Sequence, residues 1–162
     1  MAKAREIPGL TPELPFTLAA ARTVAVRAAE LFDHLDGVLD VTDIERVHDA
    51  RVATRRLRAV LELYAPCFPP EPFGAALRDV KALADALGAR RDPDVHLAAL
   101  TEFADAATPA DRPGLRLLLD RIADEQEEGN VTLARALMDV REHALRERLA
   151  MLVESAGGVE GA

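Results

Sequence analysis

The sequence predicts an all-α protein: an antiparallel helical bundle of about four short helices and one long C-terminal helix. Nearly half of the 162 residues are hydrophobic, mainly Ala, Leu and Val, with one Tyr and no Trp. That mixture suits close-packed helices better than sheets. Apolar residues recur at helical spacing, and no segment of useful length alternates as a strand would. We expect one domain over residues 12–155, between a flexible lead-in (1–11) and a flexible tail (156–162).

The first two helices have recognisable ends. The first is expected to begin between residues 12 and 17, where prolines suit a first turn, and to end at Leu35. Gly37 then acts as its C-terminal stop. The segment Thr42–Glu45 matches a capping box, in which the threonine caps the helix and the glutamate reaches back. The second helix should therefore start there and continue to about Tyr64.

Proline and glycine divide the middle of the chain. The prolines of residues 66–72 predict a stiff loop, after which a third helix covers about residues 73–87 and Gly88 ends it. A fourth helix is expected over about residues 92–107. Asp92 is a good N-cap residue, and a proline follows it at the first helical position.

The last helical pattern runs from about residue 114 to residue 154, which corresponds to roughly 60 Å if it is unbroken. Its weak point is Gly129-Asn130. The last helix therefore either breaks near Gly129 or extends beyond the bundle. In the second case it would expose an apolar edge, which usually marks a partner surface; this edge would consist of Leu133, Leu137, Val140, Ala144 and Leu152.

Charge and cysteine content limit the function classes. The formal net charge of −8 argues against a generic nucleic-acid binder, which is usually basic. A local basic face can still act almost independently, because charges are screened beyond about 8–10 Å. The single cysteine, Cys67, permits no internal disulfide and fits a reducing, cytoplasmic setting. We find no apolar run long enough for a membrane span or a secretory signal.

The most informative segment is residues 47–58, which holds four arginines and a histidine. On a helix, His48, Arg51, Arg55 and Arg58 fall within an arc of roughly 80°. Neighbouring arginines in such a row repel each other by about 0.2–0.5 kcal/mol per pair. The row therefore either pairs with acidic residues of neighbouring helices or binds an extended polyanion. The opposite side is a core-facing stripe of Ala50, Ala53, Leu57, Val60, Leu61 and Tyr64.

A second group of charged residues lies further along the chain. Arg78 and Lys81 share a helix face, and Arg90-Arg91 precede Asp92 and Asp94. The two aspartates are explained equally by helix capping or by orienting an arginine of the second helix.

Two segments together resemble a known family. The segment His48–Arg58 is similar to the first signature of CHAD domains, the conserved histidine α-helical domains. The segment Leu87–Val95 resembles their second signature, in which an Arg-Asp pair precedes Asp-Val. The order and spacing of the two motifs match, and the resemblance extends from the first helix into the long last one.

This resemblance implies a helical bundle that binds inorganic polyphosphate, in a family not established as enzymatic. We expect no metal and no cofactor. His48 is then a hydrogen-bond donor to phosphate, because no other histidine has the spacing of a metal-ligand pair. The ligand contacts carried over from the motifs are His48, Arg51, Arg55, Arg56 and Arg58, with Arg78, Lys81, Arg90 and Arg91 by a less direct correspondence.

Family members usually contain two related helical halves, each with its own basic motif, and here only the first half is evident. Either one half suffices or two chains assemble, and we expect a homodimer. Two other functions stay open. A phosphohydrolase or phosphotransferase acting on phosphate chains would need carboxylates such as Asp85, Asp92 and Asp94 to hold Mg²⁺. A helical adaptor would instead bind acidic protein segments or nucleic acid.

Overall fold

The computed structural model describes residues 3–157 and confirms the all-α class. Within these residues there is no strand. The secondary structure consists of α1 (Phe16–Leu35), α2 (Ile44–Leu63), a short 3₁₀ helix η1 (Ala65–Cys67), α3 (Pro70–Asp105), α4 (Arg112–Glu142) and α5 (Leu145–Gly157). No helix in the described part of the chain combines the length and the hydropathy that a bilayer crossing requires.

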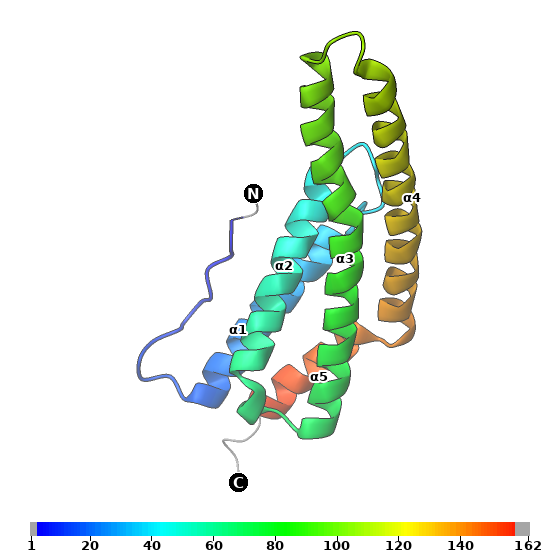
Figure 1. Ribbon diagram of the computed structural model, residues 1–162. Coiled ribbons are helices and arrows are strands. Elements are labelled where there is room, and N and C mark those ends of the chain that lie inside the picture. Colours follow the sequence, from blue (N-terminus) through cyan, green and yellow to red (C-terminus); the bar gives the residue numbers. More distant parts are fainter. Residues whose placement is uncertain (1–2, 158–162) are drawn as a thin grey trace.

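Four segments form the main part of the bundle: α1, α2, α5 and the first half of α3; the second half of α4 adds Leu133 and Val140 to its core. The second half of α3 and the first half of α4 project beyond it as a two-helix hairpin (Figure 1). The predicted apolar stripe of α2 faces the core, where Leu57 and Leu61 are fully buried. They join buried leucines and valines of the other three segments, among them Val24, Leu31, Val80, Leu83, Leu87, Leu145, Leu149 and Leu152.

The prediction of separate helices over 73–87 and 92–107 is wrong, because α3 is one continuous helix through Gly88 and Pro93. Asp92 is therefore an interior residue and caps nothing. A proline inside a helix removes one backbone hydrogen bond and crowds the preceding turn. Here Pro93 is buried against α4, and packing between α3 and α4 outweighs the local stop signals.

The last helical segment does break, but not near Gly129. The chain turns between α4 and α5, where Ala144 has a left-handed backbone with φ of 50°. The apolar edge predicted for an overhang is instead part of the bundle core, since Leu133, Val140 and Leu152 are all buried. The segment that overhangs is the other end of α4, together with the second half of α3.

Gly129 marks the closest approach of α3 and α4. A Cβ atom placed on it would lie 2.8 Å from the carbonyl oxygen of Ala89 and 3.0 Å from Cα of Arg90. Both of these are backbone atoms, which cannot turn aside as a flexible side chain can. The residue that looked like a weak point in the sequence is the position that lets the two helices touch.

The boundaries of α1 agree with the prediction, and Gly37 follows it with φ of 68°. The predicted capping box does not form: α2 begins one residue later, after Asp43, and no side chain caps it. Thr42 donates its hydroxyl to Asp40 at 2.7 Å instead. Hydrogen bonds from the Thr42 hydroxyl and backbone N–H lower the pKa of Asp40. At the other end, α5 still includes the buried Ala156, and the rest of the predicted tail, residues 158–162, lies outside the described residues.

We predict that Gly129→Ala destabilises the protein by about 1–3 kcal/mol, the usual cost of forcing extra atoms into a packed contact. The matched control is Gly88→Ala, at an interior position of α3 where a Cβ meets nothing within 4 Å. It should be neutral or stabilising by up to about 1 kcal/mol, because alanine is the better helix former. Urea unfolding followed by circular dichroism measures both, and equal stability of the two variants would contradict the contact.

Candidate functional site

The arginine row of α2 lies on solvent, opposite the buried stripe. Arg51 and Arg55 are exposed, whereas His48 and Arg58 are half-buried. The buried side of α2 packs into the core through Leu57 and Leu61, and Thr54 on that side donates its hydroxyl to the Ala50 carbonyl of the same helix at 2.8 Å. The row therefore lies on the side of α2 that faces away from the core.

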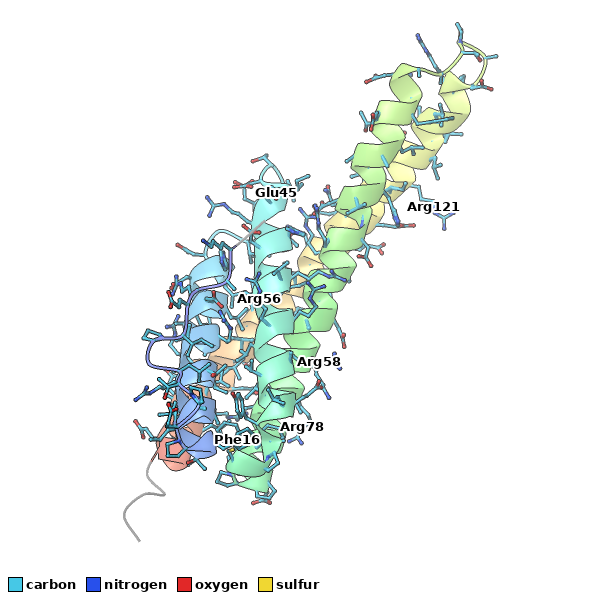
Figure 2. All side chains as sticks on the ribbon, turned by 90° about the vertical axis from the view of Figure 1, so that its left-hand side faces the viewer. Phe16, Glu45, Arg56, Arg58, Arg78 and Arg121 are labelled. Carbon is cyan, nitrogen blue, oxygen red and sulfur yellow. The ribbon has the colours of Figure 1, made fainter. Side chains whose placement is uncertain are left out.

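A carboxylate joins this row to α3. Glu62 accepts a hydrogen bond from Arg58 Nε at 3.0 Å, and the same oxygen lies 3.3 Å from Lys81 Nζ. The Arg58 hydrogen bond is the main reason why the pKa of Glu62 is lowered, with Lys81 contributing. Figure 2 shows Arg58 on the α3 side of α2 and Arg78 further along α3. We call the surface formed by His48, Arg51, Arg55, Arg58, Arg78 and Lys81 the basic face.

Two arginines of the basic face have no acidic partner. In the part of the chain that the structure describes, Arg51 and Arg55 make no ion pair and no side-chain hydrogen bond. Pairing with acidic residues of neighbouring helices, the alternative reason for such a row, does not apply to these two, and Arg58 pairs with Glu62 of its own helix. In a protein with a net charge of −8, two exposed and unneutralised guanidinium groups side by side are available to an external anion.

Arg56 belongs to a different side of α2. Figure 2 shows it directed toward α1, away from Arg58. It acts on Glu30 of α1: burial raises the pKa of that carboxyl, but hydrogen bonds from Arg5 and Arg27 and the charges of Arg27 and Arg56 lower it by more. The structure thus separates Arg56 from the basic face, although both lie in the same motif.

Arg90 lies inside the contact between α3 and α4, with 0% of its side chain exposed. It pairs with Asp94 one turn later and donates from Nε to Asn130 Oδ1 at 3.3 Å. Gln126 donates to the same Asp94 oxygen at 2.6 Å. Asp94 therefore orients an arginine of its own helix, not one of the second helix. Sequence reasoning missed the roles of Gln126 and Asn130, because no local signal shows that α4 supplies them.

The remaining charged candidates are spread over α3. Arg91 is half-buried, and its Nη1 lies 4.0 Å from the second oxygen of Asp94. Asp85 and Asp92 are exposed, and Asp92 lines a groove between α3 and α4. Within residues 3–157, no group of three or more His, Cys, Asp or Glu side chains is arranged to hold a metal ion.

The fold and this surface define an α-helical bundle in which an arginine-rich helix faces solvent beside Arg78 and Lys81 of α3. The CHAD domain family model matches residues 22–161, and this chain belongs to that family. The match includes all five helices except the first turns of α1. No curated protein gives a significant match to the chain.

We predict that Asp94→Ala destabilises the protein by about 3–5 kcal/mol, because it leaves the Arg90 charge buried without its partner. Asp92→Ala is the matched control, an exposed aspartate on the same helix, and should change stability by less than about 0.5 kcal/mol. If Asp92 were a helix cap, its loss would cost about 1 kcal/mol. Urea unfolding distinguishes these cases, and similar costs for the two variants would contradict the buried ion pair.

Proposed function

We propose that this chain binds inorganic polyphosphate along the basic face, with His48, Arg51, Arg55, Arg58, Arg78 and Lys81 as contacts and Arg91 at its edge. The observation that carries the proposal is the pair of exposed arginines, Arg51 and Arg55, that have no acidic partner among the described residues. Guanidinium groups offer fixed forks of donors that match phosphate oxygens, and such charge-assisted bonds are stronger than neutral ones. Membership of the CHAD family supports the same ligand.

The shape of the basic face favours an extended ligand. From His48 to Arg58 the row extends along α2 for about 15 Å. A linear row of donors can be neutralised by successive phosphate groups of one chain, whereas a compact anion would reach only part of it. Arg90 is left out of the proposed contacts because it is buried. Arg56 is left out because it faces α1 (Figure 2).

We propose binding without catalysis, in the cytoplasm. Hydrolysis or transfer of phosphate needs carboxylates that hold Mg²⁺ beside the basic groups. Asp94 is committed to Arg90, and Asp92 faces the groove between α3 and α4. Incubation with polyphosphate and Mg²⁺ should therefore release no phosphate. Release that the Arg51→Ala, Arg55→Ala double variant abolishes would favour the enzyme.

We predict that the Arg51→Ala, Arg55→Ala double variant binds polyphosphate at least tenfold more weakly. Without these two cations, binding releases fewer counterions and makes fewer contacts with phosphate. The matched control is Arg135→Ala with Arg141→Ala, two exposed arginines of α4, which changes net charge equally. Isothermal titration at two salt concentrations measures both. Circular dichroism should be unchanged, and equal weakening by both variants would contradict a localised site.

Competition titrations with an acidic peptide, DNA and RNA test whether polyphosphate is the preferred ligand. A polyphosphate chain should compete best at the higher salt concentration, because only it follows the arginine row closely enough to use the directional bonds. An acidic peptide or a nucleic acid that displaces polyphosphate at both salt concentrations would favour the adaptor function.

We predict that Glu62→Gln tightens polyphosphate binding by about two- to fivefold, because Glu62 now occupies Arg58 and Lys81 and adds a negative charge to the face. Exposed ion pairs are worth little, so the gain is modest. Glu45→Gln is the control, since it removes one exposed carboxylate from α2 without freeing those two cations. Weaker binding by Glu62→Gln would show that Glu62 positions Arg58 for the ligand.

A further inference from the structure

An extended segment precedes α1 and lies back along it. Residues 3–14, which we call the strap, contain turns but no helix or strand. Figure 1 shows the strap running in the direction opposite to α1 before the chain enters the helix. Close to the helix, Leu14 packs against the bundle core, and Arg22 of α1 donates from Nη1 to the Gly9 carbonyl at 2.6 Å. The second part of the strap, residues 9–14, is therefore anchored by an apolar side chain and an uncharged carbonyl.

The first part of the strap, residues 3–8, is anchored by Arg5. The backbone N–H of Arg5 donates to Oε1 of Glu30, and its guanidinium donates from Nη2 to Oδ2 of Asp33 at 2.5 Å. From Arg22 to Glu30 the helix rises about 12 Å, and an extended chain from Gly9 back to Arg5 covers about 13 Å. The strap therefore follows α1 in an extended form between two separate anchor points.

The two carboxylates that hold Arg5 differ in burial. The pair of Arg5 and Asp33 has side chains that are 51% and 56% exposed, and ion pairs of this kind contribute little. The side chain of Glu30 is only 3% exposed, and its other oxygen accepts a hydrogen bond from Arg27 Nη1 at 2.5 Å. Hydrogen bonds to an ionised carboxylate are about twice as strong as those to a neutral group. The charge of Glu30 is therefore the main support of the first part of the strap.

This support depends on pH in one direction. Charged groups face Glu30 from three elements: Arg5 of the strap, Arg27 of α1 with Asp33 beyond Arg5, and Arg56 of α2. Burial raises the pKa of Glu30, but these arginines lower it by more. A carboxyl with a lowered pKa stabilises its contacts above the ordinary glutamate value of about 4.3, and this contribution is lost as the pH falls through the lowered value. The anchors of residues 9–14 have no titratable acceptor, so acid leaves them unchanged.

We propose that Glu30 is an acid-sensitive latch for the first part of the strap. Neutralising Glu30 frees residues 3–8 from α1, while Gly9 and Leu14 keep residues 9–14 in place. The freed segment carries the cations of Lys3 and Arg5 into solvent. The latch lies on the side of α2 toward which Arg56 is directed, away from the basic face (Figure 2). It therefore does not depend on the proposed binding of polyphosphate.

A neutral variant tests the latch at pH 7. Glu30→Gln keeps the shape of the protonated carboxyl, and ¹⁵N relaxation should show the backbone order parameters of residues 4–7 falling below about 0.6, the level of a flexible chain. Those of residues 9–14 should stay at the wild-type level, with the helical circular dichroism retained. The control is Glu13→Gln, which removes an exposed carboxylate of the strap itself and should change neither part. Unchanged order of residues 4–7 in Glu30→Gln, or equal loosening of both parts, would overturn the proposal.

A pH titration of the wild type tests the sensitivity to acid. The order parameters of residues 4–7 should fall along the same pH curve as the ¹³C shift of the Glu30 side-chain carboxyl. The amide signals of α1 should keep their positions over that range, because the helix does not depend on the strap for its own hydrogen bonds. Loosening at a pH where Glu30 is still ionised, or loosening that occurs only together with unfolding of the bundle, would contradict the latch.

Discussion

The contact between α3 and α4 at Gly129 is the constraint on which the rest of the structure depends. There the backbone of α4 approaches that of α3 so closely that no side chain fits between them. Beside this point the charges of Arg90 and Asp94 are buried as a pair, and Gln126 and Asn130 add one hydrogen bond each. A buried ion pair tolerates little displacement, because separating its charges leaves each without water or partner. The close backbone contact at Gly129 and the buried pair of Arg90 and Asp94 therefore favour the same register of α4 against α3.

This contact also connects the hairpin to the bundle. Asn130, which accepts from Arg90, donates to the Leu39 carbonyl in the loop between α1 and α2, at 3.3 Å. This hydrogen bond connects the contact between α3 and α4 to the loop that precedes α2. The first half of α3 then places Lys81 beside Glu62 of α2, which creates the basic face. Its second half forms one of the two helices of the projecting hairpin. One continuous helix, α3, therefore joins the basic face to the hairpin.

The distribution of charge follows from the same arrangement. In a protein with a net charge of −8, the acidic residues within residues 3–157 form no ion pair with Arg51 or Arg55. Beyond about 8–10 Å their field is largely screened. The acidic total and the local basic face are therefore compatible, and Glu62 pairs with Arg58 and Lys81 of this face but with neither Arg51 nor Arg55.

The sequence by itself determined the features that depend on residues close in the chain. Apolar spacing predicted the all-α class and the buried side of α2, which follow from helical periodicity, and proline and glycine predicted the limits of α1. Only the tertiary structure decided where α3 and α4 continue or end. Gly88 is a local signal for a helix end and Asp92-Pro93 for a helix start, and the sequence interpretation separated two helices there; a break near Gly129 was one of its two alternatives for the last helix. Packing between the two helices overrides each of them. Likewise, neither the burial of Arg90 nor the separation of Arg56 from the basic face has a local signal, since both depend on which helix lies alongside.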